Sequence, residues 1–429
     1  MFYQSKFVRN KTAINNKFNR TNSMRISLLL LFLSNSIFAV NAADTTSIVR
    51  SVVRPVAALP AVVSPGSDND DVGKFTFSGY LDTYYFGNFN NPKSQSNLGL
   101  NGEGPGTARA FDQKAGQFGI GLVQAKAVYT ADKVDAVMDL TFGPFSDLGN
   151  YGNFSGPLGA GSTALAVKQA YITLKATPKL AFTAGQFGTH IGYEVIDAPV
   201  NYNYSLSNLF NNGPFYHIGV KAQYTFSAKA YLMLGLVNNV DNLIDNNKKK
   251  GLIGQLFVSP ATNWNVYFNA IVSNEASKDV PGVSADEANY SLFDLTTTYQ
   301  VTSKLFLGLN TATGSQKGDY QGFGGPITAR NWGGVAVYSN YAFTNKLGIG
   351  IRYETFDNKS GVRSLLDAAG NGASVNSITI TANLTGANGH VLLKPEFRLD
   401  SYSASKFERN DGTLSKSQAT LGMAAIFKF

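Results

Sequence analysis

The chain has 429 residues, of which 44% are hydrophobic, 12% aromatic and 15% charged, and it contains no Cys. This composition excludes an intrinsically disordered chain and a disulfide-stabilised scaffold. The formal net charge of +8 is concentrated at the start, because six basic residues and no acid lie within residues 1–42. The remaining 30 basic and 28 acidic residues leave a charge of +2, so the charge balance does not indicate nucleic-acid binding.

An apolar run, ISLLLLFLSNSIFAV, occupies residues 26–40 and follows a basic segment. It is too short to span a bilayer comfortably, and the small residues Val40 and Ala42 match a cleavage site after Ala42. We therefore predict a secretory signal peptide over residues 1–42. Met24 is an alternative initiator, which would leave residues 1–23 untranslated.

Residues 43–73 are rich in Val, Pro, Ser and Asp and show no alternation, which predicts a flexible periplasmic lead. From residue 74 to 429, segments of alternating polarity are joined by connections of two lengths. Seven are short, and most share a Ser or Thr followed closely by Lys and an apolar residue: 130–134, 177–180, 227–230, 259–263, 302–305, 344–347 and 386–389. Eight are longer and rich in Gly and Asn: 91–113, 144–163, 189–213, 240–249, 274–288, 315–330, 358–372 and 403–414.

The last segment, residues 415–429, shows the alternation most clearly, with apolar residues at every second position from Ala419 to Phe429. Alternation with period two is typical of a β-strand between two different environments. Seven short turns and eight long loops join about 16 such strands, an even number that is typical of bacterial outer-membrane barrels. We therefore predict an all-β fold: a transmembrane antiparallel β-barrel over residues 74–429, with short periplasmic turns and long extracellular loops. The alternative is a soluble β-sandwich or a stack of β-repeats.

The parity of each segment assigns its two faces. Apolar positions predicted to face lipid include Phe75, Phe77, Leu81, Met138, Phe142, Trp264, Phe268, Leu307, Ile351 and Tyr353, and aromatic residues near the strand ends suit interfacial girdles. Charged positions fall on the opposite parity, because Lys or Arg facing the bilayer centre costs about 2 to 4 kcal/mol. The predicted lumen-lining residues are Asp82, Lys126, Asp139, Lys175, Lys221, Arg352, Glu354, Lys394, Glu396 and Arg398.

The third long segment, residues 189–213 (THIGYEVIDAPVNYNYSLSNLFNNG), is the longest and least polar of the eight. A solvated external loop has no need of so many apolar side chains, so we predict that it folds into the lumen. Its acids would then face the basic wall across a pore constriction formed by Tyr193, Glu194, Asp197 and Tyr202. The alternative is an external loop that packs on other loops or on a neighbouring subunit.

The same region carries a family resemblance. GQFG at 185–188, IGYEVIDAP at 191–199, NGPF at 212–215 and HIGVK at 217–221 resemble the OmpL-like β-barrel porin-2 family of Gram-negative outer membranes, and GYLDTYY at 79–85 is similar too. The resemblance covers roughly residues 75–429. It implies a multi-pass barrel in the outer membrane with a porin role, and it brings no catalytic residues with it.

These patterns predict a porin that allows passive diffusion of small hydrophilic solutes or ions. The alternatives are a structural or adhesive barrel whose extracellular loops bind a partner, and a lipid-modifying enzyme, which would need a Ser or His pair on an outward face. His190, His217 and His390 have no metal-ligand spacing and His217 has inward parity, so we predict no catalytic site, metal or cofactor. The expected partners are outer-membrane lipids, the solutes themselves and further copies in a homotrimer.

Overall fold

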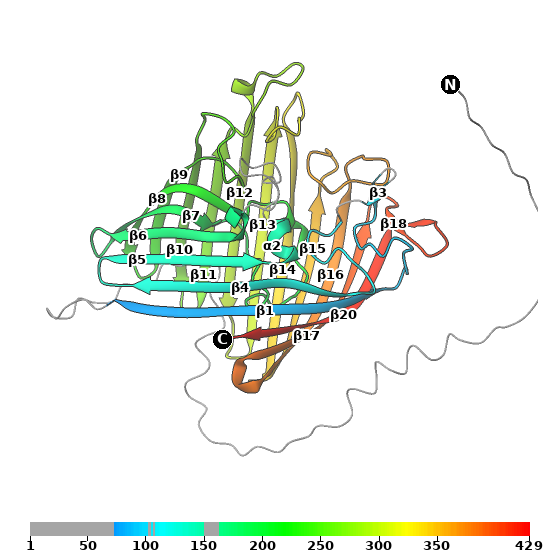
Figure 1. Ribbon diagram of the computed structural model, residues 1–429, viewed down its shortest axis with the longest axis horizontal. Helices are drawn as coiled ribbons and strands as arrows, with labels where there is room; N and C mark the ends of the chain where they lie inside the picture. The colour runs from blue at the N-terminus through cyan, green and yellow to red at the C-terminus, as the bar shows by residue number, and fades with distance from the viewer. Residues whose placement is uncertain (1–72, 102–103, 106–107, 150–162) are drawn as a thin grey trace, which may run out of the picture. The chain divides into compact units, whose positions relative to one another are not determined.

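The computed structural model describes residues 73–101, 104–105, 108–149 and 163–429, which all belong to one compact unit. The predicted signal peptide and all but the last residue of the predicted lead lie outside the described residues. Sixteen strands form a closed barrel in which each strand pairs antiparallel with the next along the chain. The last strand, β20, pairs with both β17 and β1, and this pairing closes the ring (Figure 1). The predicted barrel and its strand number are confirmed.

The strands of the barrel are 8 to 15 residues long. In chain order they are β1 (Lys74–Asn88), β4 (Phe118–Thr130), β5 (Val134–Phe142), β6 (Val167–Lys175), β7 (Leu180–Gly188), β8 (Tyr216–Ser227), β9 (Ala230–Val237), β10 (Gly251–Ala261), β11 (Trp264–Ser273), β12 (Asn289–Gln300), β13 (Leu305–Lys317), β14 (Arg330–Thr344), β15 (Leu347–Asp357), β16 (Ser374–Gly386), β17 (Val391–Tyr402) and β20 (Ser417–Lys428).

Shorter elements lie in the connections. Two small hairpins pair β2 (Leu100–Asn101) with β3 (Gly104–Pro105) and β18 (Phe407–Glu408) with β19 (Leu414–Ser415). The helices are α2 (Pro144–Gly149), α3 (Asn208–Asn211) and three 3-10 turns at Thr163–Ala166, Ala285–Glu287 and Ala387–Gly389. No helix in the described part of the chain is long and apolar enough to cross a membrane.

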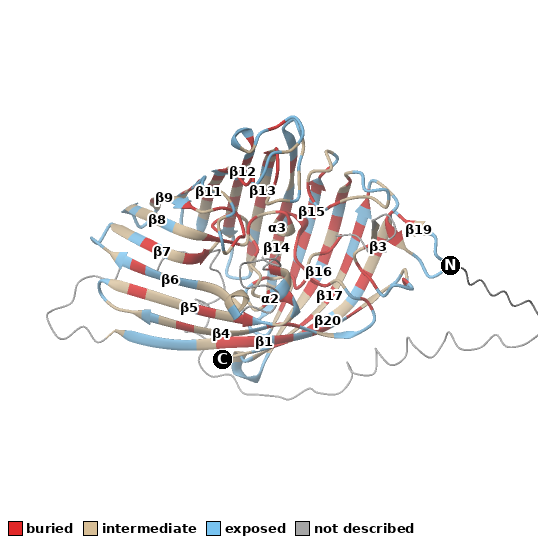
Figure 2. Ribbon diagram, turned by 45° about the horizontal axis from the view of Figure 1, so that its top comes forward, coloured by how far each residue is buried: buried red, intermediate tan, exposed pale blue. Residues whose placement is uncertain are grey.

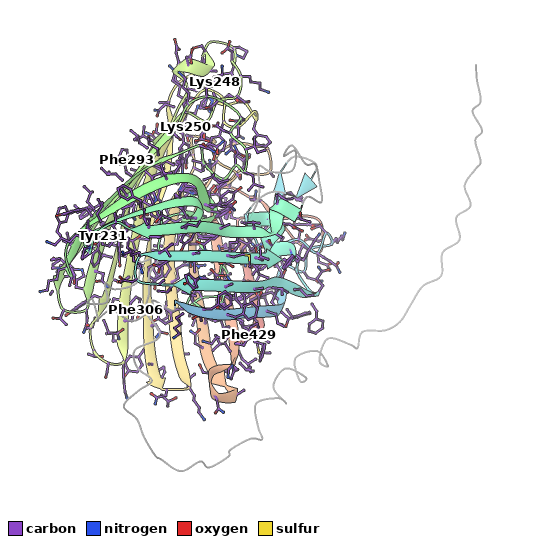
Figure 3. The ribbon with its side chains drawn as sticks, turned by 60° about the vertical axis from the view of Figure 1, so that its left-hand side comes forward. Tyr231, Lys248, Lys250, Phe293, Phe306 and Phe429 are labelled. Atoms are coloured by element: carbon purple, nitrogen blue, oxygen red, sulfur yellow. The ribbon has the colours of Figure 1, made fainter. Side chains whose placement is uncertain are left out.

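The seven predicted short turns all connect neighbouring strands at one end of the barrel. In three of them a Thr hydroxyl accepts hydrogen bonds from the backbone N–H groups two and three residues later, which closes the turn before the next strand: Thr177, Thr302 and Thr344. The long loops gather at the other end. Figure 3 shows Lys248 and Lys250 at the long-loop end and Phe306 toward the opposite end.

Burial alternates along the strands as the sequence predicts (Figure 2). The outward positions carry exposed apolar side chains, because this face of the barrel contacts lipid rather than water. Phe75 is 65% exposed, Phe268 50% and Tyr353 48%. Aromatic residues expected in a girdle are exposed close to the short turns, among them Tyr224, Tyr299 and Phe343. The opposite parity carries the polar residues, and most of these are buried.

Candidate functional site

The third loop, residues 189–215 between β7 and β8, lies against the inner face of the barrel. Its helix α3 begins after Ser207, whose hydroxyl accepts a hydrogen bond from the N–H of Phe210. The helix contacts β14 and β15, which are far from β7 and β8 around the ring. Figure 2 draws α3 within the ring of strands. The loop therefore crosses the lumen to reach the opposite wall.

Two carboxylates of that wall bind backbone N–H groups of the third loop. Glu354 on β15 accepts from the N–H groups of Asn208 (2.9 Å) and Leu209 (2.8 Å) at the start of α3. Glu396 on β17 accepts from those of Tyr204 (2.6 Å) and Ser205 (3.0 Å). A carboxylate at a helix N-terminus is favoured by the unpaired N–H groups there and by the helix dipole. Both acids thus hold the loop in place.

The basic residues of the same wall bind the loop's carbonyl oxygens. Arg352 donates to the Ser205 carbonyl (2.6 Å), and Arg398 donates to that of Leu206 (2.8 Å). Lys394 donates to the carbonyl of Asn201 in the same way. These are charge-assisted hydrogen bonds in a region closed to water, so they are strong and hard to replace.

Five of the predicted lumen-lining residues lie on this wall, and none of the five lines water. Glu354, Lys394, Glu396 and Arg398 have inward parity as expected, but they are at most 2% exposed because the loop covers them. Arg352, on the same wall, is also fully buried. The sequence can assign the parity of a strand residue, but it cannot show which part of the lumen a loop will cover.

The four residues of the predicted constriction have different environments. Glu194 is buried and forms an ion pair with Arg352, and its second oxygen accepts from the N–H of Ser207 at 2.7 Å. Tyr193 stacks on Tyr338 with ring centroids 4.0 Å apart. These two residues attach the loop to the wall, so Glu194 does not face the wall across open water as predicted.

The remaining two residues, Tyr202 and Asp197, have other partners. The ring of Tyr202 packs on that of Phe306, 5.2 Å between centroids. Asp197 is partly exposed, with 20% of its side-chain surface accessible, and its carboxylate binds Lys168 at 2.5 Å and Gln124 at 3.0 Å. Of the two predicted acids, Asp197 alone remains accessible to solutes.

Sequence reasoning missed Lys168 and Arg109. Lys168 lies at the start of β6, beside a register shift between β5 and β6, so the parity rule does not apply to it. Arg109 belongs to the first loop, yet its guanidinium is buried between Asp400 (2.9 Å) and Asp112. Neither position carries a sequence signal, because a bulge and a long-range loop contact set them.

A different part of the wall remains accessible. Lys126 on β4 and Lys221 on β8 are partly exposed, and the ammonium of Lys221 lies 4.2 Å from the ring centroid of Phe187. Lys175 pairs with Asp135 at 2.8 Å near the short turns. Asp82 and Asp139 have inward parity but are fully buried; Asp82 accepts from the Tyr204 hydroxyl at 2.6 Å. Several inward side chains of β4 to β8 are therefore partly exposed, in contrast to those beneath the third loop.

Two buried carboxylates connect the third, fourth and fifth loops at the long-loop end. Asp241 accepts from the N–H groups of Phe215 (2.6 Å) and Tyr216 (3.0 Å), and Glu275 accepts from the N–H of Val240 at 3.1 Å. Burial raises the pKa of each carboxyl to about 7, and nearby Arg363 opposes this effect at Asp241. Protonation therefore supports the packing of these loops.

The described residues contain no group of three or more His, Cys, Asp or Glu side chains that could hold a metal ion. Many of the inward side chains instead hold the third loop in place, as Glu354, Glu396 and Arg398 do. A closed antiparallel barrel of 16 strands, with an inward-folded loop and a partly accessible polar lumen, defines a porin of the outer membrane.

Comparison with known proteins agrees with this class. Residues 74–429 match the family model described as "Putative beta-barrel porin-2, OmpL-like", and the chain belongs to this family. No curated protein matches the sequence. The chain is thus a member of a porin family, a multi-pass barrel of the outer membrane.

Solved structures share the fold at low sequence identity. OmpT of Vibrio cholerae is 13% identical, with 84% of this chain and 99% of that chain covered and a TM-score of 0.51. The outer membrane channel DcaP of Acinetobacter baumannii is 12% identical, with coverages of 85% and 99% and a TM-score of 0.52. OmpF of Salmonella typhi is 10% identical, with coverages of 84% and 99% and a TM-score of 0.52. At these identities the likeness establishes the fold alone.

Proposed function

We propose that small hydrophilic solutes and ions diffuse through the part of the lumen that the third loop leaves open along β4 to β8. One observation carries this proposal: the inward side chains are unequally accessible around the ring. Thr379 and Thr381 on β16 are 0% exposed beneath the loop, whereas Tyr171 on β6 and Gln223 on β8 remain partly exposed. The route for solutes therefore follows one side of the barrel.

The narrowest part of this route is formed by the third loop and the wall that faces it. Asp197 and Lys168 form the accessible edge, while Tyr193, Glu194 and Tyr202 fix the position of the loop behind them. This ion pair is about one fifth exposed on each side chain. Such a partly solvated pair orders water at the constriction and favours polar over apolar solutes.

Because the chain has no Cys, single-cysteine variants give an unambiguous test. The protein would be refolded, and single-channel currents would be recorded in planar bilayers before and after a bulky, charged thiol reagent is added. We expect every variant to give stable ohmic steps before the reagent is added. The reagent should lower the current of Gln223→Cys and leave the current of Thr381→Cys unchanged. Val220→Cys, on the lipid-facing side of β8 and 53% exposed, is the matched control and should also show no effect.

Two results would contradict the proposal. Equal block at residues 223 and 381 would place the loop outside the lumen. A folded barrel without any conductance would instead favour the structural or adhesive alternative, in which the extracellular loops bind a partner. No catalytic residues are proposed, because the buried polar side chains described above serve the attachment of the loop.

We also propose a homotrimer. The support is a likeness of fold to OmpT of Vibrio cholerae, which has been solved in a trimer form. Native mass spectrometry of the detergent-extracted protein would test this. A mass of one chain under conditions that preserve other porin trimers would refute it.

A further inference from the structure

The inward-facing charges divide into two groups when they are sorted by accessibility. Along the strands, the acids Asp82, Asp135, Asp139, Asp294, Glu354, Glu396 and Asp400 are all buried. The partly exposed charges on the strands are lysines: Lys126, Lys168, Lys175, Lys221 and Lys428. Among the described residues of these strands and of the third loop, the inward-facing acid that is partly exposed is Asp197. The exposed Asp147 of α2 lies in the second loop, outside this set.

The buried acids act weakly on a solute because donors surround them. Glu354 and Glu396 each accept two backbone N–H groups of the third loop. Asp294 accepts from the side-chain amides of Asn269 (2.7 Å) and Asn310. Hydrogen-bond donors that point at a carboxylate offset part of the electrostatic potential it produces in the lumen. A buried carboxylate also lies further from a passing ion than an exposed ammonium does, and the interaction weakens with distance.

Among the described residues, no carboxylate forms an ion pair with Lys221. On the adjoining strands it is paired in register with Thr183 and Gly235, and its ammonium lies 4.2 Å from the ring centroid of Phe187. The aromatic face holds the ammonium without neutralising its charge. The side chain of Lys221 is partly exposed, and among the described contacts its ammonium forms no ion pair with a carboxylate.

Lys126 is paired in register with Ser78 on one side and Asp139 on the other. Asp139 is already bound by the side-chain amides of Gln124 (2.9 Å) and Gln169 (3.0 Å), and by Lys168 at 3.4 Å. No ion pair within 4 Å joins Lys126 to Asp139 among the described contacts. Lys126 therefore also contributes positive charge to the accessible lumen.

We propose that this porin selects for small anionic solutes, such as carboxylates and inorganic anions, and that Lys126 and Lys221 set this selectivity. The inference rests on the proposed route along β4 to β8. Both lysines lie on this route, one on β4 and one on β8. An ion that follows it passes exposed ammonium groups, while most inward-facing carboxylates are shielded by the third loop or by neighbouring side chains.

The test is the reversal potential of the refolded protein in a planar bilayer under a KCl gradient, which gives the chloride to potassium permeability ratio. We expect a ratio above one. Lys126→Gln and Lys221→Gln should each lower it about tenfold, because the loss of a unit charge about 6 Å from the ion in water lowers the chloride permeability about threefold and raises the potassium permeability about threefold. Lys126→Arg and Lys221→Arg keep the charge and should preserve the ratio. Lys304→Gln, in an exposed short turn, should leave it unchanged.

A second measurement does not depend on conductance. Swelling rates of proteoliposomes in gluconate and in glucose compare an anion with a neutral solute of similar size, and gluconate should enter faster unless both lysines are replaced. A cation-selective wild type, or a ratio unaffected by the double replacement, would overturn the inference while leaving the porin function intact. A folded barrel that passes neither ions nor glucose would overturn the proposed function, and the inference with it.

Discussion

Replacing Glu194 with Gln should destabilise the folded barrel by about 3 to 5 kcal/mol, because it leaves a guanidinium charged and unpaired in a site closed to water. The side chains of Glu194 and Arg352 are 2% and 0% exposed. Arg352 retains two neutral acceptors, the Ser205 carbonyl at 2.6 Å and the Thr379 hydroxyl at 3.1 Å. We therefore expect the lower end of this range, about 3 kcal/mol.

The assay is urea unfolding of the barrel in lipid vesicles, followed for both single variants and for the double variant Glu194→Gln/Arg352→Met. The double variant removes both charges, so it should recover part of the loss, and the cycle gives the coupling energy of the pair. Lys359→Met is the matched control. It breaks an exposed ion pair with Asp357, whose side chains are 69% and 58% exposed, and should cost less than about 1 kcal/mol.

The two variants should also differ in their channel currents. Releasing Glu194 frees one attachment of the third loop, so we expect larger and noisier currents from Glu194→Gln and unchanged currents from Lys359→Met. If Glu194→Gln costs no more than the control and its currents are unaltered, the loop is not held on the β15 wall, and the proposed route along β4 to β8 loses its basis.

Phe268→Arg places a charge on the lipid-facing side of β11 and should lower the unfolding free energy by about 2 to 4 kcal/mol. Asn265→Arg, on the lumen side of the same strand, should cost far less. Equal costs would contradict the assignment of the two faces. Deleting Phe429 removes both backbone hydrogen bonds that join the chain end to β1, so the unfolding free energy should fall by about 1 to 3 kcal/mol. The loop carboxyls predict a pH dependence. Burial raises the pKa of Asp241 and Glu275 to about 7, so the stabilisation present below about pH 4 is lost as the pH rises through 7. Hydrogen exchange of the fourth and fifth loops, corrected for its intrinsic rate, should reveal this loosening. The double variant Asp241→Asn/Glu275→Gln should abolish it, and loops equally protected at pH 5 and pH 8 would contradict it.

The sequence alone determined the barrel, its strand number and the two faces of its strands. Lipid and water impose a strict period of two on each strand, and residues such as Phe268 and Asn265 show it without any knowledge of their neighbours in space. The short turns were equally readable, because a Thr hydroxyl that caps its own turn, as in Thr344, is a local interaction.

Only the tertiary structure decided which inward charges face water. Glu194 and Asp197 lie three residues apart in one loop, yet the first is buried against Arg352 and the second borders the accessible lumen. Lys394 and Lys126 share inward parity, but a loop from distant strands covers only the first. Parity is a property of one strand, whereas accessibility depends on where a loop crosses the barrel. That crossing is fixed by hydrogen bonds between residues up to about 190 positions apart, such as those from Tyr204 and Ser205 to Glu396.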